Sequence, residues 1–357
     1  MPRVSDNARF DQNATCVTFT RRPVLAKMSA LPVKADVGAK LQNVLLGHQR
    51  TGLLYLPTSS LGMTMKLFVT GEGGMAMAGE SSGYVGNIPQ HYDRNLGPLI
   101  FTDYAADIAH RVAKLNPRRV LETAAGTGIV TRALRDALPA GASLTATDLN
   151  APMLDIAATK FRRGEAVEFR TADAMALPFP DASFDAIVCQ FGVMFFPDKD
   201  KSYREAFRVL DAGGHYVFSI WDSHRHNRIA HEVIGSFFPA DPPQFHSVPF
   251  AYRFEPIKES LIDAGFASIS ATVLKSQKEV ADFAMLARGL VYGSPIIDQV
   301  QQRGGVDAEG IVDAIARNYR DAFGDEPAMI PRQAIVLSAN KPSAAHLGAF
   351  MRASTSR

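Results

Sequence analysis

The stretch Arg118-Arg119-Val120-Leu121-Glu122-Thr123-Ala124-Ala125-Gly126-Thr127-Gly128-Ile129-Val130-Thr131 decides the fold of this chain. Its short apolar run, Val120-Leu121, predicts a buried parallel strand, and the apolar spacing over residues 129–138 predicts a helix. The turn between them contains Gly126 and Gly128, which lack Cβ atoms, so the backbone can bend sharply and approach a ligand closely. Strand, glycine turn and helix together are typical of α/β folds that hold nucleotide-like ligands.

Acidic residues at neighbouring strand ends strengthen this interpretation, because a lone G-x-G also occurs in ordinary strand–helix turns. Glu122 precedes the turn, Asp148 ends the second predicted strand, and Asp173 follows the third. A carboxylate in the place of Asp148 can accept hydrogen bonds from both ribose hydroxyls of an adenosyl ligand. Asp173 can take the adenine amino group and Ala174 a ring nitrogen, while Leu149 and Met153 can flank the purine. Singly, such acids are more often helix caps.

Strand and helix patterns alternate through the middle of the chain, which predicts parallel strands with right-handed crossovers and helices on both faces of the sheet. The strands are expected at residues 120–122, 143–147, 167–170, 184–189 and 215–220. Two further strands, 269–274 and 333–338, have helical patterns between them. Ahead of the sheet, residues 84–115 read as helical with a break at Gly97-Pro98. This segment either lies over a cofactor site or only contributes core aromatic residues.

These patterns divide the chain into three parts. Residues 1–74 hold nine Lys/Arg against four Asp/Glu and show no sustained periodicity, so we expect a disordered leader or a mis-assigned start, with translation beginning near Met75. Residues 75–278 and 331–345 form the main domain. Residues 279–330 form a helical insertion between the last two strands, which acts as a substrate lid or as a plain packing subdomain.

Composition excludes several classes of function. The chain has a net charge of +2, but residues 75–357 hold 29 basic and 32 acidic residues, which argues against a nucleic-acid surface. Two cysteines cannot form a disulfide framework, which favours a reducing, cytoplasmic location. No apolar run reaches the ~18 residues of a membrane span. His224, His226 and His231 lack a matching carboxylate or cysteine spacing, so no metal site is predicted.

Three runs of residues resemble class I S-adenosylmethionine-dependent methyltransferases, in particular the subgroup related to ubiquinone/menaquinone C-methyltransferases (methyltransferase type 11). The runs are residues 120–128, Thr147-Asp148-Leu149-Asn150, and residues 172–185. The most specific part is Leu177-Pro178-Phe179-Pro180-Asp181-Ala182-Ser183-Phe184-Asp185. The resemblance covers about residues 84–222 and implies a Rossmann-like α/β fold with a seven-stranded sheet whose last strand is antiparallel.

The resemblance also implies a cofactor, S-adenosyl-L-methionine, and the residues that bind it. Glu122, Gly126 and Gly128 would line the methionine part, Asp148 would hold the ribose, and Asp173 with Ala174 the adenine, while Gln190 and Phe191 would face the sulfonium and the acceptor. The predicted cofactor site also includes Ala124 and Thr127 in the turn, and Leu149 and Met153 beside the purine. Ala124 departs from the family, which has glycine there, and its methyl group is tolerated if φ stays negative.

The predicted activity is methyl transfer to a small, partly apolar molecule through an oxygen, carbon or nitrogen atom. Two alternatives remain open. A nicotinamide-binding oxidoreductase would need a small third residue in G-x-G-x-x-G/A, where Thr131 stands. A non-catalytic protein that binds an adenosyl ligand would keep the same fold. No residue is assigned a catalytic role, although His224, His226 and His231 follow the fifth strand, where acceptor groups would lie.

Overall fold

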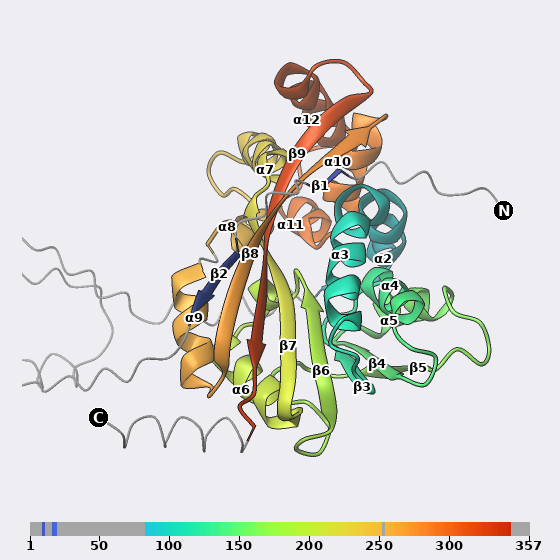
Figure 1. Ribbon diagram of the computed structural model, residues 1–357. Coiled ribbons are helices and arrows are strands. Elements are labelled where there is room, and N and C mark those ends of the chain that lie inside the picture. The colour runs from blue at the N-terminus through green and yellow to red at the C-terminus, as the bar shows by residue number, and fades with distance from the viewer. Residues whose placement is uncertain (1–8, 11–15, 20–82, 252–253, 344–357) are drawn as a thin grey trace, which may run out of the picture. The chain divides into compact units, whose positions relative to one another are not determined.

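The computed structural model describes residues 9–10, 16–19, 83–251 and 254–343, and a mixed β-sheet forms its centre (Figure 1). The strand order is β1-β8-β9-β7-β6-β3-β4-β5, and β2 also pairs with β8. The strands are β1 (Arg9–Phe10), β2 (Cys16–Phe19), β3 (Arg119–Glu122), β4 (Ser143–Asp148), β5 (Val167–Thr171), β6 (Phe184–Gln190), β7 (Leu210–Ser223), β8 (Ala267–Val280) and β9 (Ala328–Asn340).

The strands from β3 to β7 are mutually parallel, and β9 runs antiparallel between β7 and β8. Numbered from β3 onward, the order is 3-2-1-4-5-7-6, which confirms the predicted seven-stranded sheet with an antiparallel last strand. The short strands β1 and β2 extend the sheet beyond β8. The rest of residues 1–74 lies outside the described residues, so the expected leader stays a prediction.

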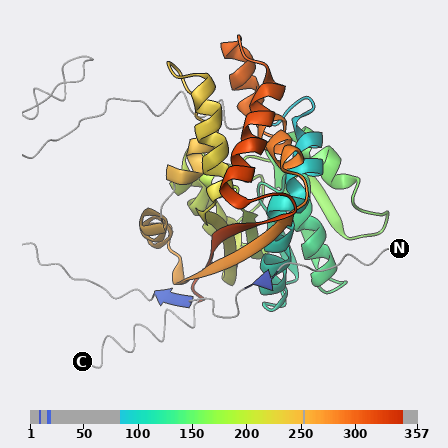
Figure 2. The ribbon, with the colours of Figure 1, turned by 90° about the horizontal axis from the view of Figure 1, so that it is seen from above.

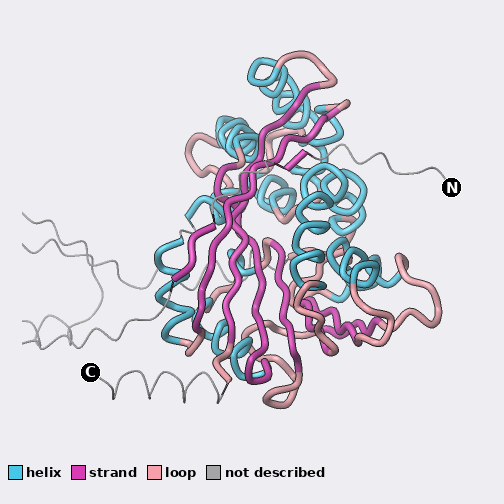
Figure 3. Tube along the Cα trace, viewed as in Figure 1, coloured by secondary structure: helices cyan, strands magenta, loops and turns pink. Residues whose placement is uncertain are grey.

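Helices cover both faces of the sheet, with α3 and α4 on one side and α9 on the other (Figures 1 and 3). From N- to C-terminus they are α2 (Ile88–His91), the π-helix η1 (Tyr92–Phe101), α3 (Thr102–Ala113), α4 (Ile129–Ala137), α5 (Ala151–Ala158), η2 (Val193–Phe195), α6 (Lys199–Val209), α7 (Arg225–Phe237), η3 (Phe245–Ser247), α8 (Val248–Ala251), α9 (Phe254–Asp263), α10 (Phe283–Tyr292), α11 (Ile296–Arg303) and α12 (Ala308–Phe323). Among the described residues, no helix combines the length and apolar character needed to cross a bilayer.

The expected break at Gly97-Pro98 is instead a continuous π-helix, η1, that runs directly into α3. The backbone N–H of Thr102 donates to the Gly97 carbonyl five residues earlier, and the Thr102 hydroxyl donates to the same oxygen at 3.0 Å. Proline in an α-helix clashes with the carbonyl four residues before it. The wider π turn accommodates Pro98 without ending the helix, and such segments are frequent at functional sites.

Three of the predicted strands prove longer than their hydrophobic patterns. β7 begins at Leu210, directly after α6, so Gly213-Gly214 lies inside the strand beside a bulge in the pairing with β6. β8 and β9 pair along their length from Ala267↔Asn340 to Val280↔Ala328. Because Gln333 pairs with Ser223 near the end of β7, the start of β9 extends past the carboxyl end of that strand. Helices α10–α12, which join β8 to β9, therefore attach on the carboxyl-end side of the parallel strands.

Those helices pack on elements that flank the same end of the sheet. α10 contacts η1, and α12 contacts α7, which follows β7. Figure 2 shows α12, in red, beside α7, in yellow. Asp282 caps α10 by accepting from the Met285 N–H at 2.9 Å, and Asp307 caps α12 by accepting from the Glu309 N–H at 3.2 Å. Within residues 279–330, where the insertion was predicted, two of the three helices are thus capped by aspartates, and the two ends of this range belong to β8 and β9.

An arginine and two aspartates link the amino ends of β3, β6 and β7, at the opposite edge of the sheet from the predicted site. The Asp185 carboxylate accepts from the backbone N–H groups of Arg118 and Arg119, at 2.8 and 3.0 Å. The Arg119 guanidinium donates to Asp185 at 2.7 Å and to Asp211, on β7, at 3.0 Å. This clamp sets the register of three parallel strands, so their carboxyl ends, and the residues there, are held in a fixed relation.

Candidate functional site

The carboxyl ends of β6, β3, β4 and β5 lie next to one another, because the four strands are adjacent and parallel. Gln190, Glu122 and Asp148 end β6, β3 and β4, and Asp173 follows β5 by two residues. Neighbouring strands lie about 4.8 Å apart. The topology therefore brings the predicted acids and the glycine turn to one edge of the sheet, which is where open α/β sheets bind ligands.

Asp148 is tied to the turn that follows β3. It is 7% exposed, and its Oδ2 accepts from the Gly126 N–H at 2.9 Å, while its Oδ1 accepts from the Asn150 N–H at 2.8 Å. Burial raises the pKa of the Asp148 carboxyl, and these hydrogen bonds oppose the rise. A second link joins the same segments, since the Ala125 N–H donates to the Thr147 carbonyl at 2.9 Å. The turn and the end of β4 thus form one rigid unit.

Glu122 is a buried acid with spare hydrogen-bonding capacity. Its side chain is 1% exposed, and its Oε2 has no hydrogen-bond partner among the described residues. Burial raises the pKa of Glu122 to about 8, and the neighbouring Asp148 charge adds to the rise, whereas the Thr131 hydroxyl opposes it. A buried polar atom without a partner is costly. A cationic ligand group placed against this oxygen would remove that cost.

The turn adopts left-handed backbone conformations, including one at Ala124. Gly126 and Gly128 have φ of 55° and 77°, and Ala124 has φ of 52°. The condition stated for tolerating the Ala124 methyl group, a negative φ, is therefore not met, because the turn holds this residue in a left-handed conformation. The methyl group is accommodated by Gly192, at which an added Cβ would lie 2.5 Å from the Ala124 Cβ.

Gly128 serves packing as well as the turn. A Cβ at this position would lie 2.7 Å from the Cβ of Ala157 on α5, so α4 and α5 approach closely here. A Cβ at Gly126 would meet only the Met153 Cε, at 3.5 Å. The side chain of Met153 is buried, at 3% exposure. A Cβ at Gly126 would therefore lie at the surface of the turn, whereas a Cβ at Gly128 would collide with α5.

The remaining predicted adenosine contacts lie beside Asp148. Leu149 is one of the few large apolar side chains in the described part of the chain that are exposed, at 52%. Asp173 forms a tight turn in which its Oδ1 accepts from the Met175 N–H at 2.8 Å, with Ala174 between them. The Ala172 N–H donates to the Asp148 carbonyl at 3.0 Å, which connects this turn to the end of β4.

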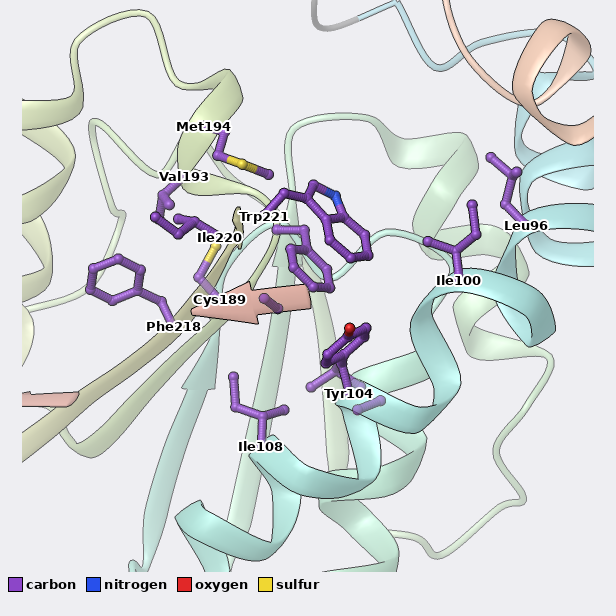
Figure 4. Close-up of a cluster of buried hydrophobic side chains, with 14 of the residues drawn as sticks. Leu96, Ile100, Tyr104, Ile108, Cys189, Val193, Met194, Phe218, Ile220 and Trp221 are labelled. Atoms are coloured by element: carbon purple, nitrogen blue, oxygen red, sulfur yellow. The ribbon is translucent and has the colours of Figure 1, made fainter. Parts of the chain in front are cut away.

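Gln190 and Phe191 connect the site to an aromatic cluster. The Gln190 Nε2 donates to the Phe101 carbonyl of η1 at 3.3 Å, and its buried Oε1 has no hydrogen-bond partner among the described residues. Phe191 has φ of 56°, an outlier for a bulky residue that marks backbone held by its surroundings. The Phe191 ring stacks on the Trp221 ring, with the two ring centroids 3.9 Å apart. The Tyr104 ring meets Trp221 edge-on, with the centroids 5.5 Å apart (Figure 4).

The structure adds residues that the sequence pattern did not single out as site residues. Burial raises the pKa values of Tyr84 and Tyr92, and the charge of Asp148 contributes, so both hydroxyls lie near that carboxylate. Lys160, after α5, donates to Asp93 of η1 and to the Thr127 carbonyl in the turn. The segment 84–101 therefore covers the site. The aromatic spacing of residues 84–101 was visible in the sequence, but no sequence pattern indicated the contact between Asp93 of this segment and Lys160.

The described residues hold no group of three His, Cys, Asp or Glu side chains arranged to bind a metal ion. Thr127 is 1% exposed, and its carbonyl is the one that Lys160 contacts. All twelve predicted cofactor residues thus lie in or beside the turn, at the adjacent strand ends, or on the loops that follow these strands. The arrangement offers carboxylates, a glycine turn and an exposed apolar side chain to a ligand that carries positive charge and a flat ring.

Part of the chain is similar in sequence to known methyltransferases. Residues 121–218 match the model of the methyltransferase domain family. A demethylmenaquinone methyltransferase of Thermus thermophilus is 44% identical over 114 residues, which are 32% of this chain and 50% of that protein. A ubiquinone/menaquinone biosynthesis C-methyltransferase of Pectobacterium atrosepticum is 30% identical over 172 residues, 43% of this chain and 68% of that protein. Among solved structures, the YcgJ protein of Bacillus subtilis has 18% identity and a TM-score of 0.44, over 68% of this chain and all of that one.

The sequence matches to the two methyltransferases cover only part of this chain and part of each relative. The chain spans about half the length of the first of these relatives and two thirds of the second. The region matched by the family model contains β3 to β7 as far as Phe218, and with it the turn, Asp148, Asp173 and Gln190. The insertion with α10–α12 lies outside that region.

Proposed function

Because the chain belongs to the class I S-adenosylmethionine-dependent methyltransferases, we propose that it transfers a methyl group from S-adenosylmethionine to a small, partly apolar acceptor. The observation that carries this proposal is the link between Asp148 and the Gly126 N–H. It joins the acid that would hold the ribose to the turn that would hold the methionine part, in one preorganised unit.

The residues present fit the donor by their chemistry. S-adenosylmethionine carries an ammonium group and a sulfonium, and the buried Glu122 offers a carboxyl oxygen that no described residue uses. We assign Glu122, Ala124, Gly126, Thr127 and Gly128 to the methionine part. Asp148 is assigned to the ribose, Leu149, Met153, Asp173 and Ala174 to the adenine, and Gln190 and Phe191 to the sulfonium side.

The protein's task in this reaction is mainly positioning. The sulfonium donor, when bound, supplies an electrophilic methyl group, so transfer is an in-line displacement that needs little covalent help. Holding two reactants in line supplies up to ~7–11 kcal/mol of the barrier reduction for well-aligned groups. Three aromatic rings would exclude water from this side of the donor, those of Phe101, Phe191 and Trp221. Their ring centroids lie 3.9 to 6.5 Å from one another.

For the acceptor we propose a chemical class, a small and partly apolar molecule. Two of the relatives are named for quinone methylation, and the aromatic side chains beside Gln190 suit a flat, partly apolar molecule. The acceptor atom is left as oxygen, carbon or nitrogen. Helices α10–α12 attach on the side where the acceptor would enter, and we propose that they act as a substrate lid.

Calorimetry of the full chain with S-adenosylmethionine and with NAD tests the donor. We expect binding of S-adenosylmethionine and none of NAD, and the reverse result would replace the methyltransferase by a nicotinamide-binding enzyme. Methyl transfer from labelled donor to quinols, phenols and small amines tests turnover. Donor binding without transfer to any class in the panel would favour a non-catalytic adenosyl-binding protein.

A further inference from the structure

Three buried histidines gather beyond the aromatic cluster, at the end of the strand next to β6. His224 follows β7 directly, His226 lies in the first turn of α7, and His246 comes from η3. They are 4%, 2% and 4% exposed. The Trp221 ring lies beside both imidazoles. Its ring centroid is 5.5 Å from that of His224 and 6.3 Å from that of His226. Three buried imidazoles from three elements are more than a core of this type needs, and only two of them were close in sequence.

The cluster lies on the acceptor side of the proposed donor site. The adjacent parallel strands β3, β6 and β7 follow one another in this order across the sheet. Gln190 pairs with Ser219, and β7 continues to Ser223, so His224 lies beyond Gln190 as seen from the donor turn and further along the strand direction. Phe191, next to Gln190, stacks on Trp221, which in turn contacts His224. A molecule placed beside Gln190 and Trp221, away from the donor turn, would therefore meet His224 first.

Hydrogen bonds hold the backbone of the two histidines behind His224. The Tyr319 hydroxyl donates to the His226 carbonyl at 2.8 Å, and the Asn227 Nδ2 donates to the His246 carbonyl at 3.4 Å. The Ser294 hydroxyl donates to the Leu290 carbonyl at 2.9 Å and lies 3.4 Å from the His246 Nε2. The Ser294 hydroxyl thus provides a polar neighbour for one ring nitrogen of His246.

The electrostatic surroundings keep all three imidazoles uncharged near neutral pH. Burial lowers the pKa of His224 to about 4 and that of His246 to about 3, and it lowers the pKa of His226 further. The charged and titratable groups that act on the cluster, besides its own members, are Arg228, Arg332 and His231. Burial and these neighbours disfavour a positive charge on His224 by itself. An acceptor that becomes an anion beside His224 supplies the opposite charge, which favours the protonated imidazole as the proton moves.

We propose that His224 is the general base that takes the proton from a hydroxyl group of the acceptor, with His226 and His246 forming the wall behind it. This inference rests on the proposed methyl transfer and adds a residue to it. In the step, the acceptor O–H bond breaks and its proton goes to an imidazole nitrogen. The acceptor oxygen, or the ring carbon conjugated with it, forms a bond to the methyl carbon. The methyl–sulfur bond breaks, and its electron pair remains on sulfur as a neutral thioether.

A series of ring-substituted phenols of graded acidity tests this role in the full chain. Methyl transfer is measured from pH 5.5 to 9 for the wild type, His224→Asn and His224→Gln, and donor affinity is measured by calorimetry. His215→Asn is the matched control, because His215 lies on β7 near the opposite end of the strand. For the wild type we expect a rate that changes little with pH, since His224 is already unprotonated.

For both His224 variants we expect unchanged donor affinity and a loss of at least tenfold for weakly acidic phenols. Their rate should rise about tenfold per pH unit, and the loss should shrink for phenols already ionised at the assay pH. A variant rate with the wild-type pH dependence would overturn the role of His224. So would a loss equal for all phenols, which indicates a structural defect, or the absence of phenol methylation in a wild type that binds the donor. Failure of the wild type to bind S-adenosylmethionine would instead remove the proposed function.

Discussion

The Oδ2 atom of Asp148 accepts a hydrogen bond of 2.9 Å from the backbone N–H of Gly126, which joins the end of β4 to the turn after β3. We expect Asp148→Ala to weaken S-adenosylmethionine binding by about 1–3 kcal/mol, the range for a lost charged hydrogen bond. Part of the loss comes from the turn, which would no longer be fixed before the donor arrives. Calorimetric titration measures the effect.

Asp155→Ala is the control for this substitution, since Asp155 lies exposed on α5, the helix that follows Asp148. It should leave the dissociation constant unchanged. Equal affinities for the wild type and folded Asp148→Ala would mean that the ribose is not held at this carboxylate.

Glu122 predicts a pH-dependent donor affinity. Its pKa of about 8 means that it is mostly protonated at pH 7, and a bound cation favours its charged form. Affinity for S-adenosylmethionine should therefore rise between pH 6 and pH 8.5, with protons released on binding. Titration calorimetry at one pH, in two buffers with different ionisation enthalpies, counts those protons.

Glu122→Gln should abolish both the proton release and the pH dependence. The same residue affects stability with a defined sign, because a carboxyl whose folded pKa is raised stabilises the fold below its unfolded pKa and loses this contribution as pH rises through about 8. Without donor, the stability of Glu122→Gln relative to the wild type should rise from about pH 5 to about pH 8 and then level off. A constant difference over that range would exclude a raised pKa.

Ala124 is predicted to be a source of backbone strain, because φ of 52° disfavours any residue with a Cβ. Ala124→Gly should raise the free energy of unfolding by about 1 kcal/mol, as measured by urea denaturation. On α4, Ala133→Gly should do the opposite by about the same amount, because glycine destabilises a regular helix.

Gly192→Ala extends this test. Its new Cβ would lie 2.5 Å from the Ala124 Cβ and 2.8 Å from the Cys189 Sγ, so the single substitution should destabilise the fold. Ala124→Gly removes one of these clashes. In that background, Gly192→Ala should therefore lower the free energy of unfolding by less than it does in the wild type. Strict additivity of the two substitutions would show that the two positions do not contact each other.

Asp185 should stabilise the protein in a pH-dependent way. Burial opposes its charge, but hydrogen bonds from the Arg119 side chain and from the N–H groups of Arg118 and Arg119 outweigh it and lower its pKa. A carboxyl with a lowered folded pKa stabilises the fold above its unfolded pKa of about 4 and loses this contribution as pH falls through the folded value. Asp185→Asn should therefore cost about 1–2 kcal/mol at pH 7 and much less at pH 2.5, by urea denaturation.

Asp181 offers a comparison for Asp185. It also forms an ion pair, with Arg208, but its side chain is 78% exposed, and such surface pairs contribute little. Asp181→Asn should change stability by a few tenths of a kcal/mol at either pH. A similar, pH-independent loss in both variants would argue against the clamp at Asp185.

The sequence predicted most of the sheet because its strands are short apolar runs separated by helical periods of 3.6. Strand, turn and helix at residues 119–137 and the acid at Asp148 were visible for this reason. Boundaries were less predictable where pairing rather than pattern sets the length. β8 and β9 extend past their apolar cores because each supplies the other with hydrogen bonds.

What the local sequence determined by itself is the order of strands and helices, and with it the alignment of Glu122, Asp148 and Asp173 at neighbouring strand ends. Parallel strands joined by right-handed crossovers leave little other choice. Tertiary structure alone decided the left-handed Ala124, the π-helix through Pro98, the contact of Lys160 with both Asp93 and Thr127, and the arrival of His246 beside His224 and His226. Each of these depends on contacts between segments far apart in the chain, and periodicity within one segment carries no information about its distant neighbours.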